Sequence, residues 1–291
     1  MLKHLTTLTL IGLVILASAC GSDDNGDATA TSPTAAAATA TTTSGPLGII
    51  AIGHSGLTGA NADPERPRTD APEYSWATGT DPGVNSIYQR LVALRPEYEG
   101  HVANRARNGA EAATLGIQAQ GGLAEVPSPA LVIIQSLDND IRCDGTDAVH
   151  VPEVGASIEQ ALRYITQEAP EARILMLTQL GRPATYAPSV AAIPEARAAA
   201  TSSDGACSLF DAAGNIDEQG IRELTALIEA YEAEQARVCA MFPQCAIADV
   251  RGFQDRLELF SNDYGHLAPA GHAAVAETVW PHVARLLGIV E

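Results

Sequence analysis

Short apolar runs alternate with longer amphipathic stretches over most of the chain. Runs of large apolar residues are typical of strands buried on both faces, and apolar residues three or four positions apart indicate helices. The expected strands cover residues 46–53, 101–106, 131–134, 173–177 and 245–250. The expected helices cover residues 84–94, 151–168, 216–241 and 269–287, and a long connection is expected from residue 178 to about 214.

This alternation of strands and helices predicts an α/β fold. Successive strand–helix–strand units make the strands parallel and place helices on both faces of the sheet. We therefore expect a flavodoxin-like, three-layer α/β/α arrangement around a doubly wound, parallel, five-stranded sheet. In an open sheet of this kind, ligands bind beyond the carboxyl ends of the strands.

Residues suited to catalysis follow three of the apolar runs and precede the last helix. In chain order they are Gly53-His54-Ser55, Asn108-Gly109, Asp138-Asn139-Asp140 and Asp263-Tyr264-Gly265-His266. A serine hydroxyl becomes a good nucleophile when an imidazole takes its proton and a carboxylate orients that imidazole. The two residues between Asp263 and His266 allow both side chains to lie on one turn, so the blocks together provide the parts of a serine hydrolase.

These four blocks resemble, in order and position, those of the SGNH or GDSL-type hydrolase family of esterases and lipases. The resemblance implies that Ser55 is the nucleophile, His266 the base and Asp263 the residue that orients the base. It also implies that the backbone N–H groups of Ser55 and Gly109 and the side chain of Asn139 bind the oxyanion. This chemistry needs no metal and no organic cofactor.

Two residues depart from the family pattern. His54 stands where the family usually has Asp, and Leu137 stands where it usually has Gly. The Asp of the family is not the nucleophile, so we expect His54 to change how the turn around Ser55 is held. Leu137 places a side chain where a close backbone approach is expected.

Substrate contacts are expected from the loops at residues 60–82 and 179–215, because loops at strand ends commonly form binding pockets. His54, Trp76 and Asp138 are candidates for these contacts. Trp76 could stack on a sugar or an acyl group, although a loop anchor is the more common role for such a residue.

The amino-terminal segment reads as a bacterial export signal. Residues 1–19 combine Lys3 with a short apolar run that ends in small residues, which is typical of a signal peptide. Cys20 follows directly and resembles a lipidation site; cleavage nearby without lipidation is the alternative. Residues 20–45 are rich in Ala, Thr and Ser and are expected to be a flexible tether. Residues 46–291 are expected to form the hydrolase-like domain.

Four cysteines remain if Cys20 is lipidated, and an even number in an oxidising compartment predicts two disulfides. They are Cys143, Cys207, Cys239 and Cys245. Four cysteines allow three pairings. The short separation of the last two favours a small loop between them, which leaves the first two to pair. No Cys-x-x-Cys motif is present, so a zinc–thiolate site is not expected.

The charge balance excludes nucleic acid as a partner. The chain has 17 basic and 35 acidic residues and a formal net charge of −18, which repels phosphate backbones. The acidic stretch Asp138–Asp140 also suits calcium, but it lacks EF-hand spacing, and no metal site is expected.

The expected protein is an enzyme of the bacterial cell envelope, lipid-anchored at Cys20. It would hydrolyse carboxylic esters through an acyl-enzyme on Ser55, with O-acetylated carbohydrates or short acyl esters as substrates. Acyl transfer to a sugar or wall polymer is an alternative, and so is a non-catalytic surface binding protein that retains the fold. The sequence does not define the acyl chain length or the oligomeric state.

Overall fold

Five parallel strands form one sheet in the order β2-β1-β3-β4-β5. The strands are β1 (Ile49–Gly53), β2 (Val102–Asn104), β3 (Leu131–Gln135), β4 (Arg173–Leu177) and β5 (Cys245–Ala248). The computed structural model describes residues 45–201, 207–253 and 256–289. The expected signal peptide, Cys20 and all of the expected tether except Gly45 lie outside the described residues.

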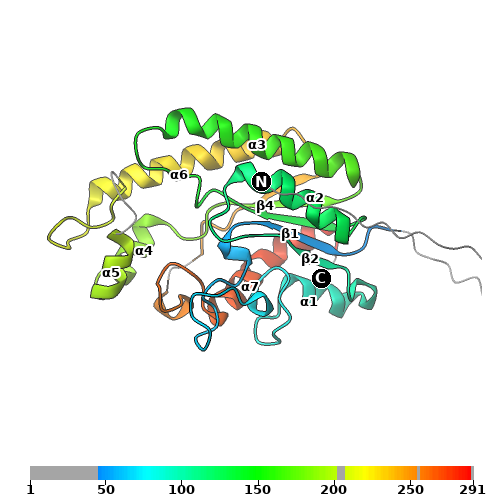
Figure 1. Cartoon of the computed structure of the whole chain (residues 1–291), viewed down its shortest axis with the longest axis horizontal. Coiled ribbons are helices and arrows are strands. Elements are labelled where there is room, and N and C mark those ends of the chain that lie inside the picture. The colour runs from blue at the N-terminus through cyan, green and yellow to red at the C-terminus, as the bar shows by residue number, and fades with distance from the viewer. Residues whose placement is uncertain (1–44, 202–206, 254–255, 290–291) are drawn as a thin grey trace, which may run out of the picture. The chain divides into compact units, whose positions relative to one another are not determined.

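Helices cover both faces of this sheet (Figure 1). They are α1 (Ile87–Leu94), α2 (Leu115–Glu125), α3 (Asp147–Glu168), α4 (Pro183–Val190), α5 (Pro194–Thr201), α6 (Glu218–Cys239) and α7 (Pro269–Leu287). The helices α2, α3 and α6 pack on one face, and α1 and α7 pack on the other. The expected three-layer α/β/α fold with a flavodoxin-like strand order is confirmed.

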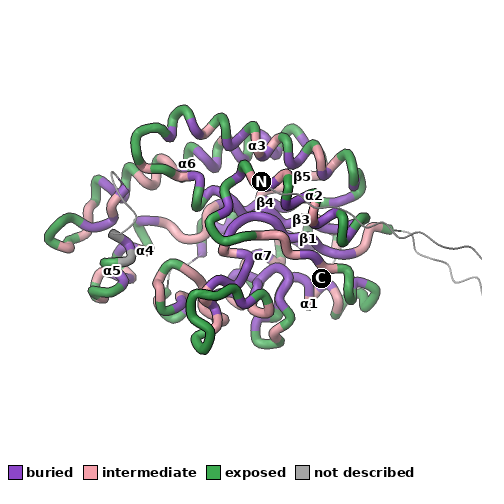
Figure 2. Tube along the Cα trace, viewed as in Figure 1, coloured by how far each residue is buried: buried purple, intermediate pink, exposed green. Residues whose placement is uncertain are grey.

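Neighbouring strand residues point to opposite faces and so divide the core in two. In β1, Ile50 joins the cluster beneath α2, α3 and α6, whereas Ile49 joins the cluster beneath α1 and α7. All five residues of β1 and of β3 are buried. The buried residues follow the strands and the inward sides of the helices (Figure 2). Burial on both faces explains why these strands read as continuous apolar runs.

Two parts of the chain differ from the sequence prediction. The helix α2 was not expected, because its Gly and Ala residues form no strong apolar stripe. Those small residues let it approach the sheet closely: a Cβ atom at Gly122 would lie 2.5 Å from Ile50 Cγ2. The expected long connection after β4 contains α4 and α5, which form a separate small apolar cluster with residues ahead of α6 and with Ile221 in its first turn.

Both expected disulfides are present. Cys143 bonds to Cys207, and Cys239 bonds to Cys245, so the favoured pairing is confirmed.

Among the helices of the described residues, none combines the length and apolar character needed to cross a membrane.

Candidate active site

Ser55 lies directly beyond the carboxyl end of β1, where it begins a short 3₁₀ helix, η1 (Ser55–Leu57). The turn depends on Gly53, whose φ is +138°. A Cβ atom at this position would lie 1.8 Å from the carbonyl oxygen of Gln135. The N–H of Gly53 donates to the side chain of Gln118 at 2.6 Å, and Gln118 donates back to the Gly53 carbonyl at 3.1 Å. The unexpected helix α2 therefore helps to hold the turn that presents Ser55.

His54 is buried beneath this turn, with only 2% of its surface exposed. Its Nδ1 accepts a hydrogen bond from the N–H of Gly56 at 3.1 Å. Its Nε2 lies 3.2 Å from the carboxylate of Asp138, which is ion-pair distance without hydrogen-bond alignment. Because Nδ1 accepts, the proton of the neutral ring belongs on Nε2, facing Asp138. His54 thus connects the nucleophile turn to the loop after β3.

Asp263 and His266 lie on one turn ahead of α7, as the spacing predicts. His266 Nδ1 lies 2.7 Å from a carboxylate oxygen of Asp263. The other oxygen of Asp263 accepts the backbone N–H of His266 at 3.0 Å and the hydroxyl of Ser261 at 2.7 Å. Asn61 also donates its side-chain amide to Asp263. These bonds fix the carboxylate and leave Nε2 of His266 available for proton transfer.

This contact shifts the pKa of both groups. Burial raises the pKa of Asp263, but hydrogen bonds from His266 and Ser261 outweigh burial and bring the pKa well below its usual range. The Asp263 hydrogen bond raises the pKa of His266 above its ordinary value, against the opposing effect of burial. The nearby carboxylates of Asp138 and Asp70 raise it further. The site therefore favours the charge pair that forms when His266 accepts a proton.

Three groups are available to bind an oxyanion. In the described part of the chain, the backbone N–H groups of Ser55 and Gly109 donate no hydrogen bond. Asn139 donates one side-chain N–H to the carbonyl of Ala110 at 3.0 Å, and its amide has a second. Preorganised N–H donors of this kind stabilise the charge that develops on an ester oxygen.

A cavity of about 350 Å³ brings these groups together. It is lined by Ser55, Ala60, Asn61, Arg68, Thr69, Asn108, Gly109, Asn139 and His266. The described residues show no hydrogen bond between Ser55 and His266, and such catalytic bonds often tighten only when substrate binds. A larger cavity of about 950 Å³ lies beside Pro46, Ala130 and Arg173, at the amino ends of the strands, and contains none of the predicted site residues.

The structure corrects the expectation for Trp76. Its ring is fully buried, and its indole N–H donates to the side chain of Gln135 at 3.2 Å. It anchors the loop to the core, and it does not line the cavity. His54 is also too buried to contact substrate. Asp138 is exposed but does not line the cavity, and it contacts His54 and Gln179.

Sequence reasoning missed two residues that shape the site. Asn61 lines the cavity and binds Asp263, across 202 positions of the chain. Asp70 accepts hydrogen bonds from the side chains of Thr58 and Asn108, both at 2.8 Å. It therefore connects Asn108, the neighbour of Gly109, to the turn that carries Ser55. The only available signal was their location in the loop expected to build a pocket.

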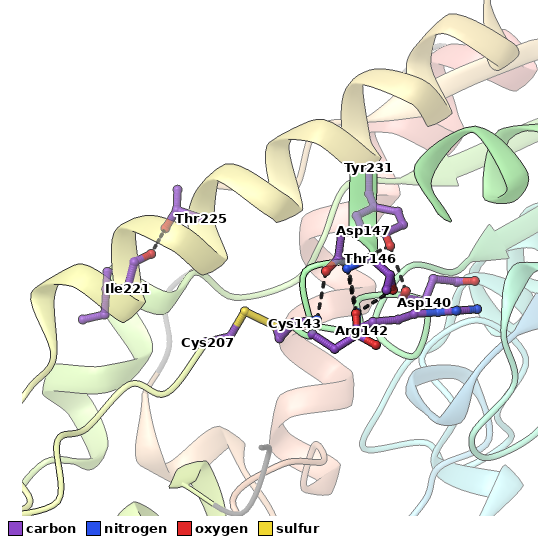
Figure 3. The surroundings of a disulfide bond; sticks show 10 residues. Asp140, Arg142, Cys143, Thr146, Asp147, Cys207, Ile221, Thr225 and Tyr231 are labelled. Carbon is purple, nitrogen blue, oxygen red and sulfur yellow. Dashed lines mark hydrogen bonds between the residues drawn. A yellow bond between two sulfur atoms is a disulfide. The ribbon is translucent and has the colours of Figure 1, made fainter. Parts of the chain in front are cut away.

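The loop after β3, which carries Asn139, is fixed from several sides. Leu137 takes the left-handed value φ +96° and is 1% exposed. Figure 3 shows the far end of the loop, where the carboxylate of Asp147 accepts the backbone N–H groups of Arg142 and Cys143. The hydroxyl of Tyr231 lies 2.9 Å from both Asp147 and the Asp140 carbonyl. The loop therefore has a defined shape although Leu stands where the family usually has Gly.

The fold and this arrangement of serine, histidine, aspartate and oxyanion donors define an SGNH-type hydrolase. The family model described as GDSL-like Lipase/Acylhydrolase matches residues 49–279. The chain therefore belongs to the GDSL-like lipase/acylhydrolase family, and the predicted class, a carboxylic ester hydrolase, is confirmed.

Solved structures share the fold at low sequence identity. TesA is 18% identical, with a TM-score of 0.51, over 82% of this chain and 99% of that one. A family two carbohydrate esterase from Clostridium thermocellum, solved with cellohexaose, is 13% identical, with a TM-score of 0.52, over 84% of this chain and 65% of that one. The acetyl xylan esterase AlAXEase is 14% identical, with a TM-score of 0.49, over 81% of this chain and 100% of that one. A search of curated protein sequences gave no match.

Proposed function

We propose that this chain is an exported, lipid-anchored serine esterase that hydrolyses short acyl esters of polar alcohols, including O-acetylated carbohydrates. The observation that carries the proposal is the shared cavity: Ser55, His266, Gly109 and Asn139 come from four distant segments and line the same space. Asp263 stands behind His266 and holds its Nδ1.

In the proposed reaction, His266 Nε2 takes the hydroxyl proton of Ser55 as Oγ attacks the ester carbonyl. The N–H groups of Ser55 and Gly109 and the amide of Asn139 bind the resulting oxyanion. His266 then returns the proton to the departing alcohol, which leaves an acyl group on Ser55. A water molecule, deprotonated by His266, attacks this acyl-enzyme and releases the carboxylic acid.

The cavity favours a small acyl group on a polar alcohol. Its volume of about 350 Å³ is near the lower end of typical small-molecule sites. Most of its lining side chains are polar, among them Asn61, Arg68 and Thr69. Such a lining can hydrogen-bond to sugar hydroxyls, whereas a long acyl chain requires an extended apolar surface.

The export signal and lipidated Cys20 are proposed from the amino-terminal sequence alone. The two disulfides support export from the cytoplasm, because disulfides persist in oxidising compartments. A Cys20→Ser variant should lose its diacylglyceryl group and leave the membrane fraction. Mass spectrometry of the mature amino terminus and fractionation measure these outcomes. If the wild-type amino terminus lies elsewhere and carries no lipid, the anchoring proposal is wrong.

The catalytic proposal is tested with a fluorophosphonate probe, which labels only activated serines. The label should map to Ser55, and Ser55→Ala should lose both labelling and hydrolysis of p-nitrophenyl acetate. Ser157→Ala, on α3 away from the cavity, serves as the matched control. A panel of acetylated sugars and of p-nitrophenyl esters with longer acyl chains then tests the substrate class. Wild-type turnover in Ser55→Ala would overturn the assignment, and faster cleavage of long-chain esters would overturn the short-acyl proposal.

A further inference from the structure

Three potential metal ligands gather beside the two loops that carry oxyanion donors. Glu111 lies two residues after Gly109. Asp140 directly follows Asn139, and His150 lies in the first turn of α3. One carboxylate oxygen from each acid and one ring nitrogen of the histidine all lie within 4.8 Å of one another.

His150 provides an independent sign of a ligand. Its side chain is only 9% exposed, and its buried Nε2 has no hydrogen-bond partner among the described residues. Its Nδ1 lies 3.0 Å from the carboxylate of Glu153. That contact favours a proton on Nδ1 and a free lone pair on Nε2. A ring held by a carboxylate on one nitrogen and open on the other is the usual state of a metal-binding histidine.

Within the described residues, neither acid of the cluster has an arginine or lysine as an ion-pair partner. Asp140 is 1% exposed, and its carboxylate accepts the N–H of Ala112 at 3.0 and 3.2 Å. A bound cation would neutralise both acids.

We infer that Glu111, Asp140 and His150 bind a divalent transition-metal ion, with Zn²⁺ the best match, and that the ion cross-links the two oxyanion loops. Zinc binds carboxylate oxygen and imidazole nitrogen at 2.0–2.2 Å, which sets tetrahedral ligands about 3.4 Å apart. The three ligand atoms lie within 4.8 Å of one another, so zinc binding would require them to move closer together. Calcium and magnesium prefer six or more oxygen ligands and fit this set less well.

The site is distinct from the reaction centre. None of the three ligands lines the cavity that contains Ser55. The ion would therefore act on position, by joining the segment after Gly109 to the segment after Asn139, and the ester chemistry would proceed without it. This inference is independent of the proposed esterase activity, because binding can be measured with no ester present.

Titration calorimetry of the untagged, full-length chain in detergent, freed of metal with EDTA, tests the site with ZnCl₂. We expect one zinc ion per chain. At a zinc concentration about 100-fold above Kd, Tm should rise by about 5–10 °C. Amide hydrogen exchange around residues 109–112 and 138–141 should slow when zinc binds.

Variants separate this site from adventitious binding. Glu111→Gln is the preferred variant, because Glu111 is exposed and makes no helix-capping bond; affinity should fall at least tenfold. His150→Gln should have the same effect. Glu97→Gln, which changes an exposed glutamate at the start of another 3₁₀ helix, is the matched control and should bind like the wild type. Absence of binding, or equal binding by Glu111→Gln, would overturn the site. Tighter binding of Ca²⁺ or Mn²⁺ at the same residues would overturn the choice of zinc.

Discussion

Nε2 of His54 lies 3.2 Å from the carboxylate of Asp138. The residue before the proposed nucleophile Ser55 therefore contacts the residue before the proposed oxyanion donor Asn139. His54 stands where the family usually has Asp, and its ring lies against Asp138 in the loop that follows the neighbouring strand β3. Asp138 is therefore the partner of the unusual residue His54, and the polar contact between them joins the two loops.

Restoring the family residue alone should harm this enzyme. In His54→Asp, a second carboxylate would lie against Asp138, and repulsion should displace the loop; we expect kcat/KM to fall about tenfold, equivalent to about 1.4 kcal/mol. The double variant His54→Asp/Asp138→Asn should recover most of the loss. Rates with p-nitrophenyl acetate complete the double-mutant cycle. Equal loss in the single and double variants would show that the two residues are not coupled.

Asn139→Ala should reduce kcat by about 10²–10³, because it removes one oxyanion donor that acts mainly in the transition state. KM should change little. Steady-state kinetics measure both constants, and a circular dichroism spectrum checks that the fold is intact. A variant that retains wild-type kcat would place the third oxyanion donor elsewhere.

The pH dependence of activity should report the pairing of His266 with Asp263. His266 must be neutral to accept a proton, and Asp263 raises its pKa. The acidic limb of kcat/KM should therefore have its midpoint above the ordinary histidine pKa of about 6.5. In Asp263→Asn the raising charge is gone, so the midpoint should move to lower pH while the maximal rate falls. An unmoved midpoint would contradict the pairing.

At position 137, a glycine variant should be more stable than an alanine variant, which is the reverse of the usual order. Removing its buried side chain should cost about 2–5 kcal/mol of unfolding free energy in either variant. At φ +96°, however, Leu137→Gly loses the Cβ that is disfavoured in a left-handed conformation, which is worth about 1–2 kcal/mol. Urea unfolding should therefore find Leu137→Gly more stable than Leu137→Ala. The same pair of substitutions at Leu162, buried within α3, should show the ordinary order, with glycine less stable.

His272 should make the fold sensitive to acid. It is buried in α7, and neither ring nitrogen has a hydrogen-bond partner in the part of the chain that the structure describes. Burial lowers its pKa to about 3. Between pH 6.5 and 3, His272 is protonated in the unfolded chain but stays neutral in the folded chain. As the pH decreases through this range, this residue therefore lowers the free energy of unfolding by about 1.4 kcal/mol per pH unit.

A His272→Leu variant removes this dependence, and its stability should fall less than that of the wild type between pH 7 and pH 5. Urea unfolding at each pH measures the difference. His101→Leu, at an exposed position, is the control and should retain the wild-type slope. Parallel slopes in the wild type and His272→Leu would show that the folded protein accommodates the charge.

Much of the fold follows from local pattern. The strand at residues 173–177 and the helix at residues 269–287 have the predicted bounds, because their apolar periodicity is set by near neighbours in sequence. Pro269 begins that last helix, and Gly288, with φ +67°, ends it. In contrast, α2 has little periodic signal, since its fit depends on how closely Gly122 approaches the sheet.

The sequence by itself determined the order of the five strands and of four helices, α1, α3, α6 and α7, and the chemistry of the four polar blocks, because spacing and residue type are local properties. Only the tertiary structure decided which of those groups share a cavity. It buried Trp76, paired His54 with Asp138, and brought Asn61 to Asp263 across 202 positions. Such contacts depend on the packing of helices and loops against a common sheet, and no short stretch of sequence encodes them.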